Sequence, residues 1–320
     1  MNIEEIKTNM KNISDRSDEL VLETYFVLKK GNEETLKRVD LEVEAQTKLK
    51  REFLQNLSNL IIHNEELELQ KVSEATNEEN MLLYYDLEEL ESLSMLNKLN
   101  ENEEWETYSF DDDELSEITG IIYLVHNDDQ TLIAYKKTYP INLVKKDSRG
   151  VKIWKPQNSE RFVEVTEDIY SIYPDMDLFM LDGEMYILNL KVLERFFDFH
   201  DVIVSSANDA INKIDDIGIL VDTSVLQDII SEMSQARKLT QVGMHSPVIG
   251  KVTGEDIMGF VNKHPALTGK FKFNEDQTKI ELDTKVSARL FIKLLNDDYL
   301  LSELTELHYD TRAKSAVDNT

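Results

Sequence analysis

The stretch DLFMLDGEMYILN, residues Asp177–Asn189, gives the clearest indication of fold class in this chain. Apolar residues dominate both halves of it, and Asp182-Gly183 occupies the two-residue turn that needs a positive φ at each position. We therefore predict an antiparallel β-hairpin here. A short helix is expected directly after it, over Leu190–Phe197.

Further strands are expected outward from this hairpin, mostly on its N-terminal side. Runs of β-branched and aromatic residues, or of alternating polar and apolar residues, predict strands at Glu19–Leu28, Lys37–Glu42 and Leu67–Val72. Two more hairpins are predicted, from Gly120–His126 with Thr131–Lys137 and from Phe271–Phe273 with Lys279–Leu282. Between Val43 and His63, apolar residues recur every three to four positions, which predicts an amphipathic helix that packs on these strands.

Helical patterns dominate the chain from Ser205 onward. Helices are predicted at Asp222–Leu239, between Thr253 and Pro265, and as a pair at Val286–Leu295 and Leu300–Leu307. Strands and helices are thus segregated along the sequence, which is typical of an α+β protein. We expect an antiparallel, β-rich N-terminal part with a packed helix, residues 1–199, followed by a mainly helical C-terminal part, residues 200–320.

The composition excludes several classes of protein. The 320 residues include 63 Asp and Glu against 35 Lys and Arg, a formal net charge of −28. The absence of cysteine excludes disulfides, zinc knuckles, iron–sulfur clusters and thiol nucleophiles. No run of about 18 uncharged apolar residues occurs, and Met1–Lys11 carries an acidic pair where a signal peptide would be basic and apolar. A cytoplasmic protein without direct membrane insertion is therefore expected.

One basic segment, residues 136–161, stands out in this acidic chain. It holds eight bases and two acids, interleaved with Tyr139 and Trp154 and preceded by Tyr135, the composition of a nucleic-acid surface. A chain at −28 is repelled by DNA at long range, so binding would be local, salt-dependent and helped by a second copy or a partner. The alternative is that these cations only neutralise the acidic residues that precede them.

The candidate DNA-binding residues come from this segment and from a second, acid-free stretch, Met233–Gly254. That stretch is either a loop that contacts phosphate or an ordinary connection between helices. The candidate DNA-binding residues are Lys136, Lys137, Lys145, Lys146, Arg149, Lys152, Lys155, Arg237, Lys238 and Lys251.

The acidic segment Glu101–Glu117 contains nine acids and no base. Repulsion among them predicts an extended, mobile linker, within residues 99–118. Trp105, Tyr108 and Phe110 are unusual in such a strip, so part of it is expected to dock, either on its own domain or on a partner.

No catalytic, metal or cofactor site is predicted. The six histidines lack metal-ligand spacing, and no complete phosphate loop, dinucleotide-binding or hydrolase motif occurs. The nearest approach to a metal-dependent nuclease is a set of acids with one lysine, which a charged hairpin edge also explains. That set is Asp276, Glu281, Asp283 and Lys285.

Two stretches resemble a known family. Leu294–Ser315, LLNDDYLLSELTELHYDTRAKS, resembles the C-terminal ending of the KwaB family, the soluble component of the Kiwa anti-phage defence system, and Tyr173–Phe197 looks like the core of the same domain. The resemblance covers residues 120–320. It implies a cytoplasmic DNA-binding defence protein that forms homo-oligomers and acts with the membrane-spanning protein KwaA, and it carries over no DNA-contact residues.

The sequence and the resemblance together favour a non-enzymatic effector of bacterial phage defence that binds double-stranded DNA and is recruited to the inner membrane by its partner. An acidic DNA mimic or protein-interaction module remains an alternative, and a nuclease using Asp283 and Lys285 is a weaker one. A homodimer or larger assembly is expected, with the helical pair Val286–Leu307 as the candidate contact. Burial of its apolar residues in the core is the alternative, and these are Val286, Leu290, Phe291, Leu294 and Leu295.

Overall fold

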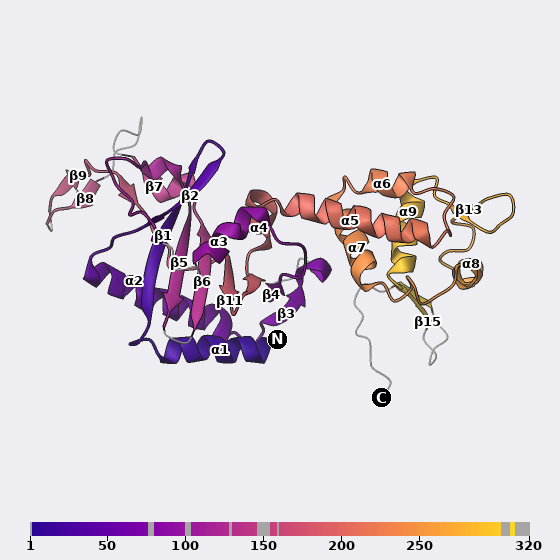
Figure 1. Cartoon of the computed structure of the whole chain (residues 1–320), viewed down its shortest axis with the longest axis horizontal. Helices are drawn as coiled ribbons and strands as arrows, with labels where there is room; N and C mark the ends of the chain where they lie inside the picture. Colours follow the sequence, from indigo (N-terminus) through magenta and orange to yellow (C-terminus); the bar gives the residue numbers. More distant parts are fainter. Residues whose placement is uncertain are drawn as a thin grey trace. The chain divides into compact units, whose positions relative to one another are not determined.

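The computed structural model describes residues 2–75, 80–99, 104–127, 130–145, 154–158, 160–301 and 308–310, and Figure 1 traces the whole chain. Its contacts divide it into two compact units. The N-terminal unit comprises Met1–Val72, Asn77–Tyr85 and Glu89–Phe197. The C-terminal unit comprises Ser73–Thr76, Asp86–Glu88 and Asp198–Thr320. The C-terminal unit is therefore discontinuous in sequence, because two short segments from the β-rich half of the chain belong to it.

An eight-stranded sheet forms the centre of the N-terminal unit (Figure 1). Its order is β2-β1-β5-β6-β11-β12-β4-β3, and all neighbours are antiparallel except β3 and β4, which are parallel. The strands are β1 (Val21–Lys30), β2 (Glu33–Arg38), β3 (Glu68–Lys71), β4 (Met81–Tyr84), β5 (Ile118–His126), β6 (Thr131–Lys137), β11 (Leu178–Leu181) and β12 (Glu184–Ile187). The predicted α+β class, with its antiparallel, β-rich N-terminal part, is confirmed.

The hairpin expected at Asp177–Asn189 is formed by β11 and β12. Met180 pairs with Met185, and the turn residues Asp182 and Gly183 have φ values of 52° and 82°. Positive φ at both positions matches the twist of the flanking strands, which explains the Asp-Gly pair. The hairpin of β5 with β6 is also as predicted.

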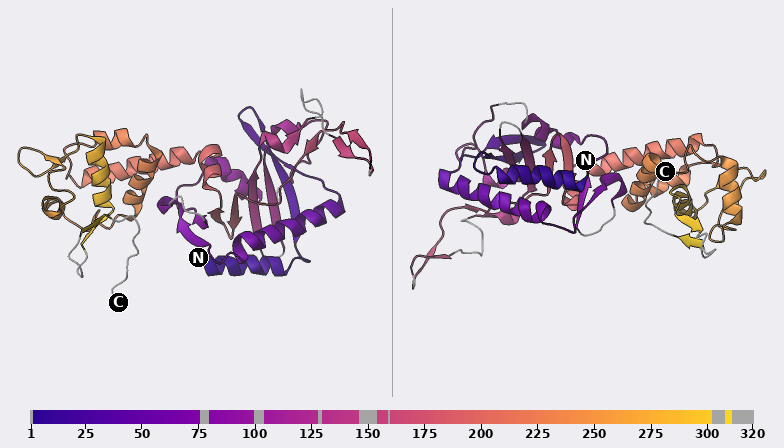
Figure 2. Two further views of the ribbon diagram at one scale, coloured as in Figure 1. Left: turned by 180° about the vertical axis from the view of Figure 1, so that it is seen from behind. Right: turned by 90° about the horizontal axis from the view of Figure 1, so that it is seen from below.

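Two helices cover one face of this sheet. Figure 2 shows α1 (Ile3–Asp15) and α2 (Val43–Leu57) running side by side across it. Phe53 of α2 packs 5.1 Å from the ring of Tyr123 on β5, and both side chains are fully buried. The helix of Val43–His63 is thus confirmed, with its last turn widened into a π-helix over Ser58–Ile62.

Helix α1 was not expected from the sequence. It begins with a capping box at Asn2 and Glu5 and buries Ile6, Met10 and Ile13 against the sheet. The second strand was also misplaced: β2 ends at Arg38, where the chain was expected to continue extended to Glu42. The alternating polar and apolar residues of KRVDLE favoured a strand there. Pairing with β1 instead places the strand at Glu33–Arg38.

The opposite face of the sheet packs against short helices. α3 (Ser94–Lys98) buries Leu96, and α4 (Leu190–Phe196) buries Val192 and Leu193, as predicted for the residues after the hairpin. The ring of Phe197 meets Tyr135 of β6 edge-on at 5.2 Å. The unit therefore has three layers, with the sheet in the middle.

The C-terminal unit is mainly helical, as predicted. Its helices are α5 (Phe199–Asp216), α6 (Ser224–Ile229), α7 (Met233–His245), α8 (Gly254–Lys263) and α9 (Lys285–Leu295). Two hairpins accompany them, β13 (Lys272–Phe273) with β14 (Ile280–Glu281) and β15 (Tyr299–Leu301) with β16 (His308–Asp310). Among the described residues, no helix combines the length and apolar character that a bilayer span requires.

Three expectations for this part were wrong. The helix of Asp222–Leu239 is two helices, α6 and α7, separated by a turn that ends at Glu232. Leu300 and Leu301 belong to a strand rather than a helix, and residues 302–307 lie outside the described residues. Helix α5 is the third difference, because no helix was predicted over Phe199–Asp216.

The apolar face of α9 does not form the free surface expected of a dimer contact. Phe291, Leu294 and Leu295 are buried in the core of the C-terminal unit, whereas Val286 is 63% exposed. The spacing that suggested a contact thus reflects packing within the unit.

Hydrogen bonds hold the two outlying segments within the C-terminal unit. The Ser73 hydroxyl donates to Asp86 at 2.5 Å and lies 3.0 Å from Nε2 of His245 at the end of α7. The Ser73 amide also donates to Asp86, at 3.0 Å. Glu74 and Asp86 carboxylates lie 3.6 and 3.7 Å from the same ring nitrogen. One serine and one histidine therefore join three distant stretches of sequence.

Candidate nucleic-acid interface

The candidate cations are divided between the two units of the chain. Lys136, Lys137, Lys145 and Lys155 lie in the N-terminal unit, and Lys146, Arg149 and Lys152 lie outside the described residues. Arg237, Lys238 and Lys251 belong to the C-terminal unit.

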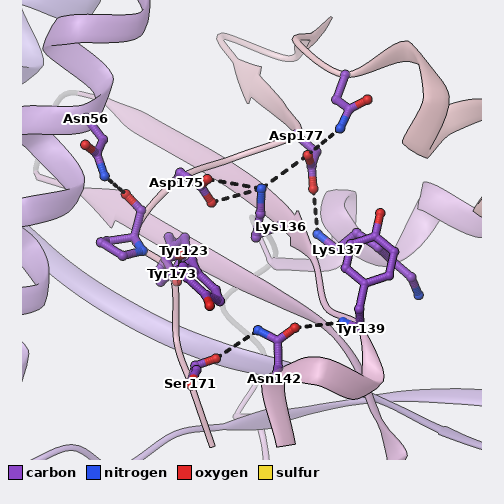
Figure 3. A network of polar contacts seen from close by, with 12 residues as sticks. Asn56, Tyr123, Lys136, Lys137, Tyr139, Asn142, Ser171, Tyr173, Asp175 and Asp177 are labelled. Carbon is purple, nitrogen blue, oxygen red and sulfur yellow. Dashed lines mark hydrogen bonds and ion pairs between the residues drawn. The ribbon is translucent and has the colours of Figure 1, made fainter.

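Lys136 has a structural role at the end of β6. Its ammonium lies 3.0 Å from Asp175 and 3.4 Å from Asp177 (Figure 3). Burial lowers the pKa of Lys136, but these carboxylates more than offset that and raise it overall. Asp177 also accepts the amide of Lys137 at 2.8 Å and the side chain of Asn189 at 2.9 Å. Lys136 is therefore already neutralised.

Lys137 has a different environment, because neighbouring residues of a strand face opposite sides of the sheet. Its ammonium lies 4.4 Å from the ring centroid of Phe196, at the end of α4. Burial lowers the pKa of Lys137, and nearby Glu34 and Asp177 offset only part of the shift. Lys137 is thus a half-buried cation held over an aromatic face.

Lys137 and Lys145 line the same cavity, which we call the aromatic cavity. Its volume is about 490 Å³, and two of its rings, Tyr139 and Phe196, are 45% and 42% exposed. These two rings meet edge-on, with centroids 5.9 Å apart. The described lining contains no carboxylate. It comprises Leu115, Ser116, Ile118, Thr119, Lys137, Thr138, Tyr139, Pro140, Leu143, Lys145, Tyr170 and Phe196.

The loop that carries Tyr139 is held by its own hydrogen bonds. Figure 3 shows Asn142 accepting from the amide of Tyr139 at 2.9 Å and donating to the carbonyl of Ser171 at 3.0 Å. Next to it, β7 (Leu143–Val144) pairs with β10 (Ile169–Tyr170). The rim of the cavity is therefore held by the Asn142 side chain and by strand pairing within its own unit.

A second cavity, of about 440 Å³, shares Leu115, Ser116, Leu143 and Lys145 with the first but has the opposite charge. Its acids come from two loops. They are Asp113, Glu114, Glu167 and Asp168. Lys145 thus stands at the boundary between an acid-free and an acid-rich hollow.

The acidic segment contacts its own unit over residues 106–117, which is one of the two kinds of docking expected for its aromatic residues. The Tyr108 ring packs edge-on to Phe26 at 5.3 Å, so part of the segment docks on its own unit. Lys30 lies 3.5 Å from Asp113 and 3.4 Å from Glu117, and Lys37 pairs with Glu106. Among the described residues, the bases paired with these acids belong to β1 and β2. Residues 101–103 lie outside the described residues.

The remaining candidates lie elsewhere. Lys155 is exposed on the hairpin of β8 (Trp154–Pro156) and β9 (Phe162–Glu164), where Phe162 is 64% exposed. Arg237 and Lys238 are half-buried on α7, and the Arg237 guanidinium lies 5.7 Å from the Phe199 ring. Of the three candidate DNA-binding residues in the C-terminal unit, only Lys251 is exposed.

The suggested nuclease residues hold separate ion pairs. Asp283 lies 2.7 Å from Lys272, and this ion pair lowers the pKa of its carboxyl. Lys285 lies 3.1 Å from Glu232. The described residues contain no cluster of three or more His, Asp or Glu side chains with a geometry suited to a metal ion.

Sequence reasoning missed Phe196 and Tyr170, which complete the aromatic cavity. They lie far along the chain from Lys137, and only the packing of α4 and β10 brings the three together. The adjacent aromatic pair Phe196-Phe197, next to a predicted helix end, was the one available signal, because both rings cannot turn into the same core.

Comparisons with known proteins agree with the resemblance in the sequence. The family described as Kiwa protein KwaB-like matches residues 115–305. The chain is 31% identical over 292 residues to a protein named Kiwa protein KwaB from Escherichia coli O55:H7 (strain RM12579 / EPEC), which covers 90% of this chain and 91% of that protein. No solved structure matches the chain. The chain therefore belongs to the Kiwa protein KwaB-like family, and its role is in Kiwa anti-phage defence.

Proposed function

We propose that this protein binds DNA as a non-enzymatic effector of Kiwa defence. The observation that carries the proposal is the aromatic cavity, which combines two lysines and two partly exposed rings with an acid-free lining. In a chain of net charge −28, a phosphate backbone can approach only where carboxylates are absent. Cations with interleaved rings supply both phosphate contacts and stacking surfaces.

The overall charge sets the conditions for binding. Long-range repulsion requires short-range contacts that release counterions, so affinity should fall steeply as salt rises. Two copies bound to one DNA would double the number of such contacts, which is why we propose a homodimer or larger assembly.

We further propose that the membrane protein KwaA recruits this otherwise cytoplasmic protein to the inner membrane. Family membership supports a partner from the same defence system. Fractionation of cells that express the protein with and without KwaA tests this. Membrane association is expected only when KwaA is present.

Fluorescence anisotropy with labelled DNA at two salt concentrations tests the DNA proposal. Lys137→Gln with Lys145→Gln removes both cations of the cavity without adding repulsion. The slope of log K against log salt should become shallower by about 2 units, at roughly 0.9 per lost phosphate contact on a duplex. The matched control, Lys263→Gln with Lys270→Gln, neutralises two exposed lysines of the C-terminal unit and should leave the slope unchanged.

The remaining basic segment is tested in the same way. Reversing the charge of Lys145, Lys146, Arg149 and Lys152 together should make the slope shallower by about 3 to 4 units, alike for unrelated sequences. If neither set of substitutions changes the affinity for DNA, Lys251 becomes the next candidate for the DNA-binding surface. If the protein binds no DNA at low salt, the protein-interaction alternative is favoured, and cleavage of DNA with Mg²⁺ would favour the nuclease.

A further inference from the structure

We propose that the aromatic cavity takes an unstacked nucleobase, so that the preferred ligand is single-stranded DNA rather than an intact duplex. This inference rests on the proposed DNA-binding function and specifies the form of DNA that the site recognises. It follows from the size of the cavity, the exposure of its rings and the position of its charges.

The size of the cavity suits one nucleotide. At about 490 Å³ it falls within the range of roughly 300–1,000 Å³ that small-molecule pockets occupy. A double helix is too wide to enter it, and the faces of its paired bases are covered by their neighbours. Only an unpaired base can leave the stack and present a face to a ring inside a pocket.

The rings leave a stacking face free. The ammonium of Lys137 covers one face of Phe196, and the Phe196 and Tyr139 rings meet at 71° rather than stacking on each other. Tyr139 does not stack on Phe196, and 45% of the residue is exposed. Stacking of a base on such a ring is favourable for every base, because each has a π-face.

The charges orient the strand. Lys137 and Lys145 line the cavity, whereas the neighbouring cavity beyond Lys145 carries four carboxylates. The phosphates of a bound strand would therefore follow the two lysines and avoid the acidic side. Burial already lowers the pKa of Lys137, and a phosphate beside it would favour its charged form.

The lining residue Tyr170 keeps its hydroxyl away from solvent. The Tyr170 hydroxyl is buried and makes no hydrogen bond of good geometry with the described residues, although the Thr138 hydroxyl near it moderates the rise in the pKa of Tyr170 that burial causes. The Thr138 hydroxyl itself donates to the carbonyl of Ile118 at 3.1 Å. Stacking on a ring discriminates little between bases, so the sequence preference should be weak.

The experiment compares a labelled oligothymidine with a blunt hairpin duplex of the same nucleotide count, using the full-length protein. Tyr139→Leu and Phe196→Leu keep apolar volume while removing the aromatic face. Each should weaken binding of the single strand about tenfold, because stacking contributes roughly 1–3 kcal/mol per base, and should change duplex binding less than about twofold. The control is Phe110→Leu, a ring that is 82% exposed and lines the acidic cavity, which should change neither.

A second readout locates the base. An oligothymidine that carries one 4-thiothymine should crosslink to the peptide containing Tyr139 or to that containing Phe196. Equal affinity for both DNA forms, or ring variants that weaken both equally, would overturn the inference and leave the proposed DNA binding intact. Failure to bind either form at low salt would overturn both.

Discussion

A single carboxylate, Asp177, organises the start of the hairpin that first indicated the fold. It is 4% exposed and accepts from a lysine side chain, a backbone amide and an asparagine side chain. Three donors on one buried carboxylate tie β6, β11 and the residue before α4 together. The same contact removes Lys136 from the charge available to DNA, although the sequence places it first among the candidates.

We predict that Asp177→Ala lowers the free energy of unfolding by about 2–4 kcal/mol, because it leaves buried donors without an acceptor. Urea unfolding followed by circular dichroism measures this. The side chain of Asp175, the other partner of Lys136, is 39% exposed. Asp175→Ala should therefore lower the free energy of unfolding by less than about 1 kcal/mol. Equal losses for the two variants would contradict this account.

Lys137 gives the site a dependence on pH. Burial lowers its pKa, so its ammonium loses the proton at a lower pH than an exposed lysine does. The contribution of Lys137 to DNA affinity is therefore present while its ammonium is protonated and is lost as pH rises through this lowered pKa. As pH rises toward the pKa of an ordinary lysine, affinity should fall in the wild type. It should fall less in Lys137→Gln, which lacks the titrating group.

Among the helices and strands, the sequence predicted those that depend on residues close together in the chain. The Asp182-Gly183 turn and the capping box of Thr253 with Asp256 act through neighbouring residues, and both are found. Helix α1 carries only three buried apolar residues among charged ones, and its stability comes from the sheet beneath it. The ion pairs of the acidic segment likewise depend on residues distant in sequence, because Lys30 and Lys37 belong to β1 and β2.

Helix α1 is predicted to be essential to the N-terminal core. Met10 is fully buried against the sheet. Met10→Ala should lower the free energy of unfolding by about 2–5 kcal/mol through the lost apolar contacts and the cavity left behind. Thermal or urea unfolding measures this, and Asn12→Ala on an exposed position of the same helix should have little effect.

Close packing of α5 and α7 depends on Gly243. A Cβ atom there would lie 2.5 Å from Cβ of Ala210 and 3.0 Å from its Cα, so the helices would have to separate. Gly243→Ala should therefore destabilise the C-terminal unit by about 1–3 kcal/mol. Gly259→Ala in α8, where a Cβ atom meets nothing within 4 Å, should stabilise it by up to about 1 kcal/mol. If both substitutions changed the free energy of unfolding in the same direction, this account of the packing would be contradicted.

For the whole molecule, the sequence predicted the segregation of strands and helices but not the aromatic cavity. The lysines were visible as a charge cluster, whereas the ring of Phe196 reaches them only through the docking of α4. Charge clusters are features of sequence, and cavities are features of tertiary packing. Cations that are close in sequence, such as Lys136 and Lys137, therefore have unrelated roles.

The assembly state is a prediction for the intact protein. Two copies that present their lysines to one DNA strand gain affinity without any new contact. Light scattering at micromolar concentration should give at least twice the 37.1 kDa of one chain. A monomeric mass would show that the chain does not gain affinity for DNA by presenting two copies to it.

The discontinuous C-terminal unit has a consequence for how such chains diversify. A recombination event near residue 198 would transfer His245 without the serine and aspartate that bond with it, since those precede the breakpoint by more than a hundred residues. Chimeras between relatives joined at that point should inherit mismatched partners. Ser73, Asp86 and His245 are thus expected to be inherited as one block, which makes the helical half a poor module for exchange.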